Sequence, residues 1–217
     1  MYIGIEGAIG VGKTTLARLL QKSFEARLLL EVFEENPFLS EFYTDRERYA
    51  FQTQIFFLLS RYHQQRRTVF EILNEGANLI ADYTFEKDAL FALINLKGDE
   101  LEMYNNVHDA LAEKIVPPDL VVYLRADTDV LMQRIAMRDR PYERSMERAY
   151  IDEVNQSYDS FFADGLNRRS PVLTIDTNEL DYVRSVEDLK RVEERIRQSL
   201  KMAPFQTKLP LDEDSGS

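Results

Sequence analysis

Hydrophobic and polar positions alternate along this chain in two kinds of segment. Short, continuous apolar runs are typical of strands that are buried on both faces. Longer segments, in which apolar residues recur every three or four positions, are typical of amphipathic helices. We expect strands at residues 2–6, 27–32, 78–82, 120–125 and 172–176. We expect helices at residues 13–25, 46–74, 84–95, 99–115, 127–137, 144–163 and 183–201.

This alternation predicts parallel strands joined by helical crossovers, which is an α/β fold. We expect a three-layer sandwich with a five-stranded parallel sheet between two layers of helices. Because no internal repeat or long linker divides the chain, we predict a single domain over residues 1–203. The polar, acidic segment 204–217 is predicted to be a disordered tail.

A glycine-rich segment, GAIGVGKT at residues 7–14, directly follows the first expected strand and opens the first expected helix. It has the pattern GxxxxGK[ST], whose backbone N–H groups surround nucleotide phosphates. Lys13 would add charge near the β and γ phosphates, and the Thr14 hydroxyl would bind Mg²⁺. We therefore predict that ATP is bound by Gly7, Ala8, Ile9, Gly10, Val11, Gly12, Lys13, Thr14 and Thr15.

The composition excludes several other classes of function. A net charge of −11 argues against non-specific nucleic-acid binding. The absence of cysteine excludes thiolate sites, and the two isolated histidines, His63 and His108, are expected on helix surfaces rather than on a metal. No apolar run approaches the roughly 20 residues of a membrane span. We therefore expect a cytoplasmic protein.

The phosphate loop alone does not define the reaction. A switch GTPase needs an N-K-x-D segment for base recognition, and this segment is absent. The small size of the chain favours a small-molecule kinase, which requires a site for the phosphate acceptor and a basic lid over the phosphates.

Two carboxylates follow expected strands at the edge where ligands bind in parallel sheets. Glu31 ends the second expected strand and could be a general base toward an attacking hydroxyl, or a solvated loop residue. Asp82 ends the third expected strand and could hold Mg²⁺, or cap the helix expected to begin near Thr84.

Two further groups of polar residues could contact substrates. Gln54 and Arg61 lie two helical turns apart on one face of a long helix, where they could read a nucleobase or simply face solvent. An arginine-rich stretch could form the lid or an ordinary charged helix face; its arginines are Arg134, Arg138, Arg140, Arg144 and Arg148.

The segments LLLEVFEENPF, QIFFLLSR and RIAMRDRPYE resemble the deoxyribonucleoside kinase family, from the phosphate loop to about residue 163. The chain is most similar to the bacterial deoxyadenosine/deoxyguanosine kinase branch. The resemblance implies a P-loop kinase with an arginine lid formed by Arg134, Arg138 and Arg140. It implies that Glu31 is the base toward the 5′-hydroxyl, that Gln54 and Arg61 contact the nucleobase, and that Tyr43 and Glu143 contact the 3′-hydroxyl.

One segment departs from the animal members of the family, in which Arg and Ser directly follow the acidic residue after the third strand. Here the sequence is DYTFEKDALFA. Asp82 can keep the carboxylate role, but the missing positive charge must come from Lys87 or from a lid arginine. Asp88 is expected to be a partner of Arg61 around the base.

The resemblance therefore implies ATP- and Mg²⁺-dependent phosphorylation of a deoxyribonucleoside, preferably deoxyadenosine or deoxyguanosine, at the 5′-hydroxyl. The alternatives are a thymidylate-type nucleoside monophosphate kinase and a non-catalytic nucleotide-binding subunit. A homodimer is expected, or a heterodimer with a related kinase, through an apolar surface of the long helix. The residues expected on this surface are Ile55, Phe56, Leu58, Leu59, Val69 and Phe70.

Overall fold

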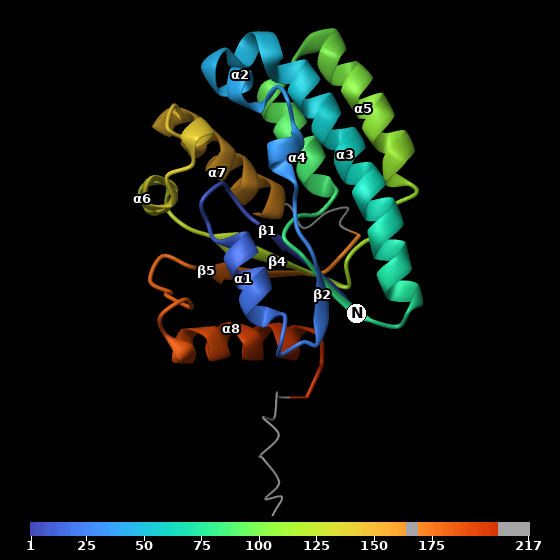
Figure 1. Ribbon diagram of the computed structural model, residues 1–217, viewed down its shortest axis with the longest axis vertical. Coiled ribbons are helices and arrows are strands. Elements are labelled where there is room, and N and C mark those ends of the chain that lie inside the picture. The colour runs from blue at the N-terminus through green and yellow to red at the C-terminus, as the bar shows by residue number, and fades with distance from the viewer. Residues whose placement is uncertain (164–168, 204–217) are drawn as a thin grey trace, which may run out of the picture.

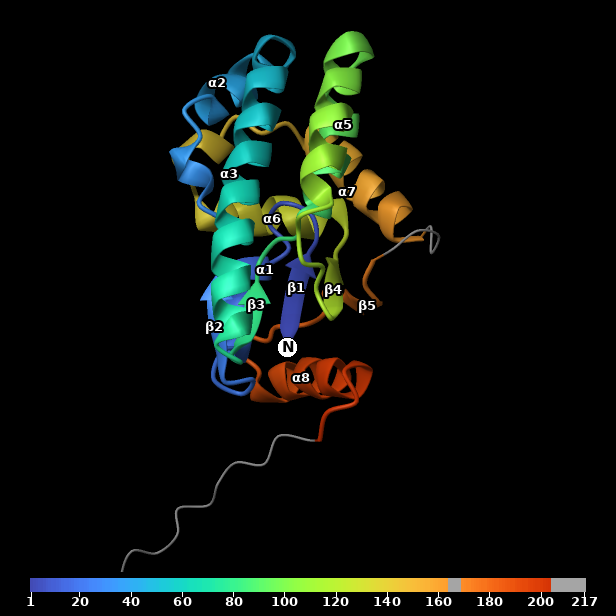
Figure 2. The same ribbon diagram turned by 90° about the vertical axis from the view of Figure 1, so that its right-hand side faces the viewer.

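The computed structural model describes residues 1–163 and 169–203. Its centre is one sheet of five parallel strands in the order β2-β3-β1-β4-β5. The strands are β1 (Tyr2–Glu6), β2 (Ala26–Leu29), β3 (Asn78–Ala81), β4 (Leu120–Arg125) and β5 (Val172–Asp176). The predicted five-stranded parallel α/β fold is confirmed, with helices on both faces of the sheet (Figures 1 and 2).

Helices connect every pair of consecutive strands. The α-helices are α1 (Lys13–Leu20), α2 (Leu39–Thr44), α3 (Arg46–Asn74), α4 (Glu86–Asn95), α5 (Gly98–Ala112), α6 (Thr128–Arg138), α7 (Arg148–Ala163) and α8 (Val186–Ser199). Two short 3₁₀ helices, η1 (Phe33–Glu35) and η2 (Pro141–Glu143), complete the described part of the chain. Among the described residues, no helix combines the length and apolar character that crossing a membrane requires.

The predicted elements are all present, but several boundaries were wrong. β2 ends at Leu29 rather than at residue 32, so Glu31 lies in the connection that follows the strand. The helix expected over 144–163 begins at Arg148, because Pro141–Glu143 forms a separate 3₁₀ turn. The short helix α2 was not predicted. The expected tail, residues 204–217, lies outside the described residues, and the single domain over 1–203 stays a prediction.

Helix α3 lies against one face of the sheet, on the side opposite to α1 (Figure 2). Its buried residues Val69 and Ile72 pack with Leu29 of β2 and Leu79 of β3. The prediction that Leu58 and Val69 lie on an apolar surface is therefore wrong, since both belong to the core. Leu59 and Phe70 of the same helix are exposed, as expected.

The carboxyl ends of the strands face the part of the molecule where α2, α6 and α7 meet (Figure 2). Helix α8 lies at the bottom of both views, with its end near the first residue of the chain, and its Val192 and Ile196 share a core cluster with α1 (Figures 1 and 2). In an open parallel sheet, ligands bind beyond the carboxyl ends of the strands. The connections that follow β1, β2 and β3 therefore lie where a ligand is expected to bind.

Candidate active site

The glycine-rich segment after β1 forms a loop that only glycine can follow at three positions. Gly7, Gly10 and Gly12 have φ angles of 147°, 88° and 103°, a region that residues with a Cβ rarely adopt. A Cβ on Gly7 would also lie 2.4 Å from the carbonyl oxygen of Leu124. Helix α1 starts directly after Gly12, so the loop presents its backbone and the helix N-terminus to the same point, as a phosphate site requires.

Lys13, the first residue of α1, turns back toward this loop. Its Nζ donates to the carbonyl oxygens of Gly7 at 2.7 Å and Ala8 at 3.1 Å. Burial, and next the charge of Lys87, lowers the pKa of Lys13 to about 8. The ammonium group thus lies in the mouth of the loop, where a bound phosphate would replace two neutral carbonyl partners with a charged one.

Asp82 follows β3, and its carboxylate accepts hydrogen bonds from α1 and from the connection after β2. One carboxylate oxygen accepts a hydrogen bond from the Thr14 hydroxyl, and the other accepts from the backbone N–H of Glu31 at 2.8 Å. Helix α4 begins at Glu86 without a side-chain cap, so the alternative that Asp82 caps this helix is wrong. The structure brings together the two residues predicted to hold Mg²⁺, and both offer the oxygen ligands that this ion prefers.

The donors available for a metal ion are few. In the described ranges, no group of three or more His, Cys, Asp and Glu side chains could hold a metal ion. Mg²⁺ in kinases is usually bound by one or two protein oxygens together with the substrate phosphates. The pair of Thr14 and Asp82 fits that arrangement.

Glu31 lies next to this pair, in the connection after β2, and two cations hold its carboxylate. Arg61 of α3 donates to Oε1 through Nε at 2.9 Å and through a second N–H. Lys87 of α4 donates to Oε2 at 2.7 Å. The side chain of Glu31 is only 13% exposed, so the alternative of a solvated loop acid is wrong.

The charge state of Glu31 follows from these contacts. Burial acts to raise the pKa of its carboxyl, but the charges and hydrogen bonds of Arg61 and Lys87 outweigh burial and hold the pKa well below its usual value. Glu31 is therefore ionised at neutral pH. An ionised carboxylate can accept a hydrogen bond from an incoming hydroxyl.

Gln54 and Arg61 are both buried, at 2% and 5% exposure, so the alternative that they face solvent is wrong. Arg61 forms an ion pair with Asp88, which is fully buried behind it. This is the predicted pairing, although Asp88 does not line the cavity that Gln54 and Arg61 line. The amide oxygen of Gln54 has no partner within the described part of the chain, which leaves it available to a ligand.

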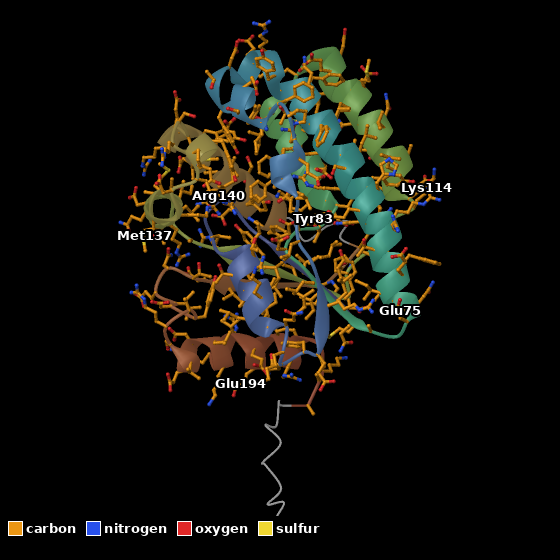
Figure 3. The ribbon with its side chains drawn as sticks, viewed as in Figure 1. Glu75, Tyr83, Lys114, Met137, Arg140 and Glu194 are labelled. Carbon is orange, nitrogen blue, oxygen red and sulfur yellow. The ribbon has the colours of Figure 1, made fainter. Side chains whose placement is uncertain are left out.

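The lid arginines occupy two different positions. Arg138 donates to both carboxylate oxygens of Glu143, and Arg140 lies 3.5 Å from one of them. Arg134 instead donates to the carbonyl oxygens of Val11 and Thr177, which ties α6 to the phosphate loop. Figure 3 shows Arg140 nearer the centre of the molecule, whereas Met137 of α6, which is 79% exposed, lies at the outer edge.

The remaining arginines of the stretch lie outside the site. Arg144 pairs with Asp139, and Arg148 pairs with Asp129. All four side chains are more than half exposed. For these two arginines the alternative of an ordinary charged surface holds.

A cavity lies between the phosphate loop, α3 and the lid, and it joins most of the predicted residues. Predicted residues that line it are Ile9, Gly10, Lys13, Thr14, Glu31, Tyr43, Gln54, Arg61, Asp82, Arg138, Arg140 and Glu143. Its volume is about 110 Å³.

Two aromatic side chains that line this cavity, Phe33 and Tyr142, were not predicted as site residues. Tyr142 of η2 stacks on Tyr43 with ring centroids 6.4 Å apart, and Phe33 of η1 lies 5.8 Å from Tyr142. The guanidinium of Arg140 lies 4.2 Å from the centre of the Phe33 ring. The contact between η1 and the lid therefore forms part of the cavity wall.

Comparison with known proteins decides what kind of protein has this site. The deoxynucleoside kinase family model matches residues 3–201. The chain belongs to the deoxynucleoside kinase family. The kinase is 34% identical to deoxyguanosine kinase of Bacillus subtilis (strain 168) over 200 residues, which cover 91% of this chain and 96% of the relative. It is 30% identical to the deoxyadenosine/deoxycytidine kinase of the same organism over 202 residues, or 89% and 90% of the two chains.

A solved structure has the same fold. Deoxyadenosine kinase from M. mycoides with bound dCTP superimposes on the kinase with a TM-score of 0.77 and 25% sequence identity. The match covers 91% of this chain and all of that chain. The predicted family and fold are both confirmed.

Two charged residues of the kinase's site were missed as site residues by sequence reasoning. Lys87 is expected only as one possible source of a missing charge, and in the structure it contacts Glu31 together with Arg61. Glu6 is expected only as the last residue of a strand, but the residue is 1% exposed and its carboxylate accepts a hydrogen bond from the phosphate loop. A carboxylate at the end of a buried apolar strand, directly before the glycine-rich loop, is the signal that could have revealed Glu6.

Proposed function

We propose that this kinase transfers the γ-phosphoryl group of ATP to the 5′-hydroxyl of a purine deoxyribonucleoside, deoxyadenosine or deoxyguanosine. The observation that carries the proposal is the position of Glu31. Its ionised carboxylate lies in a cavity that also contains the phosphate-loop lysine and the predicted base-reading residues. The relatives named deoxyguanosine kinase and deoxyadenosine/deoxycytidine kinase support the choice of substrate class.

On the donor side, the phosphate loop and Lys13 bind the β and γ phosphates, and Arg138 and Arg140 approach from the lid. Positioning and electrostatic stabilisation provide most of the catalysis in phosphoryl transfer. The three cations neutralise charge that spreads over the transferring group. Thr14 and Asp82 would hold Mg²⁺, which supplies further positive charge to the phosphates.

On the acceptor side, Oε2 of Glu31 is the oxygen that a substrate hydroxyl can reach best. Oε1 already accepts two N–H groups of Arg61, whereas Oε2 accepts only from Lys87. A 5′-hydroxyl bonded to Oε2 gives its proton to this carboxylate as the bond to phosphorus forms and the bond to the leaving ADP breaks. Lys87 then lies beside the acceptor oxygen and provides the positive charge that Arg provides in animal members of the family.

The inner end of the cavity would select the base and the sugar. The free amide oxygen of Gln54 and the guanidinium of Arg61 offer an acceptor and a donor to the base edge. Tyr43 and Glu143 would contact the 3′-hydroxyl. Because Glu143 is held by Arg138 and Arg140, binding of the sugar and of the phosphates would draw on the same three side chains.

We also propose that the kinase is cytoplasmic and forms homodimers through the exposed apolar residues of α3, Leu59 and Phe70, which are 41% and 59% exposed. Light scattering on the purified protein would measure its mass. A monomer at micromolar concentration would contradict the homodimer and favour a heterodimer with a related kinase.

The experiment that tests the proposed reaction measures phosphate transfer from ATP with Mg²⁺ to the four deoxyribonucleosides, the matching ribonucleosides and dTMP. Glu31→Gln should lower kcat by roughly 10²–10⁴-fold, because the amide cannot take the proton. Glu35→Gln is the matched control, since Glu35 is exposed and four residues away. Transfer only to dTMP would favour the monophosphate kinase, and no stimulation of ATP turnover by any acceptor would favour a binding subunit.

A further inference from the structure

Glu6 is a buried carboxylate that links three separate parts of the chain. One oxygen accepts from the backbone N–H of Thr84 at 2.5 Å. The other accepts from the backbone N–H of Gly7 at 3.3 Å and from the Tyr158 hydroxyl of α7 at 3.0 Å. Glu6 is only 1% exposed, so water is not an alternative partner for any of these groups.

The two backbone donors belong to the two halves of the candidate active site. Gly7 is the first residue of the phosphate loop, and its carbonyl oxygen accepts from Lys13. Thr84 lies two residues after Asp82 and three residues before Lys87, in the connection between β3 and α4. One carboxylate therefore bridges the segment that would hold ATP and the segment that carries the metal and acceptor groups.

A second contact fixes Thr84 on β1. A Cβ on Gly4 would lie 2.5 Å from the side-chain methyl carbon of Thr84. The missing side chain at Gly4 therefore creates the space that the Thr84 side chain fills. Thr84 is thus held by β1 at two points, through packing at Gly4 and through the hydrogen bond to Glu6.

We propose that Glu6 is a positioning residue, which fixes the phosphate loop and the β3–α4 connection relative to each other. Through these segments it keeps Thr14 opposite Asp82 and keeps Lys13 at a set position relative to Lys87 and Glu31. It does not touch the reacting atoms. The proposal rests on the proposed function, because its effect is on transfer between a donor and an acceptor that the two segments hold.

The chemistry of the position requires a carboxylate. Both carboxyl oxygens accept hydrogen bonds from backbone N–H groups, and a glutamine amide would direct an N–H₂ group at one of these N–H donors. One backbone donor would then lose its partner, and the segment that carries it would shift. In phosphoryl transfer, misplacement by about 1 Å can cost roughly 100-fold in rate.

The test compares Glu6→Gln with Asp119→Asn. Asp119 makes the same kind of bond at the other end of β1, where its carboxylate accepts from the backbone N–H of Tyr2 at 2.7 Å. For both variants one would measure thermal unfolding, kcat, KM for ATP and for deoxyguanosine, and the Mg²⁺ concentration for half-maximal activity. All assays would run at a temperature where each variant is fully folded.

We expect Glu6→Gln to lower kcat about 30-fold or more and to raise the half-maximal Mg²⁺ concentration several-fold. KM for the nucleoside should change less than about threefold, since Gln54 and Arg61 have no contact with Glu6. Asp119→Asn should leave all four kinetic quantities within about twofold of wild type. If folded Glu6→Gln keeps kcat and the Mg²⁺ requirement of the wild type, Glu6 only stabilises the fold and the proposal is wrong.

Two further measurements keep the outcome decisive. If Glu6→Gln does not fold, Glu6→Asp replaces it; its shorter side chain cannot reach Gly7 and Thr84 together, and kcat equal to wild type would refute the proposal. If the wild type transfers phosphate to no nucleoside, the proposed function fails. In that case the affinity of each protein for MgATP, measured by calorimetry, tests the positioning role of Glu6 by itself. We expect Glu6→Gln to bind MgATP about tenfold more weakly than the wild type, and equal affinity would contradict the positioning role.

Discussion

Replacement of Lys87 by methionine would remove one charge from the centre of the site while keeping most of the side-chain volume. The Lys87 side chain is 9% exposed, and its Nζ lies 2.7 Å from Oε2 of Glu31. Methionine can still pack beside Phe91, whose ring centre is 5.5 Å from the Lys87 Nζ. The change therefore tests the charge rather than the packing.

The size of the effect follows from this geometry. At 2.7 Å and an effective dielectric constant of about 20, the attraction between the two charges is about 6 kcal/mol. The cost of burying both groups offsets much of this attraction. A preorganised donor beside the acceptor oxygen is typically worth about 2.7–4 kcal/mol in the transition state. We therefore expect kcat to fall by roughly 10²–10³-fold.

The assay is steady-state transfer from ATP to deoxyguanosine at saturating concentrations of both substrates. Lys87→Arg, which keeps the charge, should recover most of the lost activity. Lys22→Met, which removes an exposed lysine of the same kind, should be neutral. If folded Lys87→Met keeps kcat within threefold of wild type, the positive charge beside Glu31 has no part in transfer and a lid arginine must supply it.

Three other measurements test different parts of the structure. Reductive methylation followed by ¹³C NMR, without nucleotide or Mg²⁺, should show that Lys13 has a pKa of about 8. Because this pKa lies below the unfolded value of 10.5, the free energy of unfolding should increase as the pH is raised from 8 to 10.5. A set of lysines that all titrate near 10.5 would contradict the burial of Lys13. Arg61→Met should lower the free energy of unfolding, measured in urea, by about 3–5 kcal/mol, because it leaves the buried Asp88 carboxylate unpaired. Arg67→Met, which removes an exposed ion pair with Glu71, should lower it by less than about 1 kcal/mol. Equal decreases in the two variants would contradict the burial of the Arg61–Asp88 pair. Gly7→Ala should abolish ATP binding, because at a φ of 147° the new Cβ would meet the backbone oxygen of Leu124. Gly76 also has a positive φ, 73°, but no atom lies near its Cβ position. Gly76→Ala should therefore lower the free energy of unfolding by about 1 kcal/mol and leave ATP binding unchanged.

The sequence predicted those parts of the site that depend on local rules. The glycine spacing predicted a phosphate-binding loop directly before a helix, and the structure has a loop with three glycines at positive φ followed by α1. The seven-residue spacing of Gln54 and Arg61 placed both on one face of α3, because two helical turns span about seven residues. These features need no knowledge of how distant segments pack.

The contacts between elements were harder to predict. Whether Asp82 would hold a metal or cap a helix depended on Thr14 and on the Glu31 backbone, which are 68 and 51 residues away along the chain. The direction of Lys87 depended on where α4 begins, and the expected start near Thr84 was two residues too early. His108, expected on a surface, is buried because α5 turns it toward Phe85, on which its ring stacks at 4.9 Å. Each error concerns tertiary packing, which hydrophobic periodicity alone does not specify.

Before any substrate binds, most charged side chains of the site already have partners within the protein, and this affects how substrates can bind. Lys13 donates to two loop carbonyls, Arg61 and Lys87 hold Glu31, and Arg138 and Arg140 hold Glu143. A substrate therefore gains little from simple attraction to a free charge, and a group that binds Lys13, Arg138 or Arg140 must replace an internal partner.

Under the proposed function, hydrolysis of ATP would require Arg138 and Arg140 to reach the phosphates, and Glu143 holds both arginines. If the sugar 3′-hydroxyl engages Glu143, as the proposed function requires, nucleoside binding weakens that hold and releases the arginines toward ATP. The same carboxylate would then make phosphate neutralisation depend on the presence of the acceptor. Glu143→Gln should accordingly increase the ratio of ATP turnover without nucleoside to ATP turnover with nucleoside. An unchanged ratio would show that Glu143 does not couple the lid arginines to the sugar site.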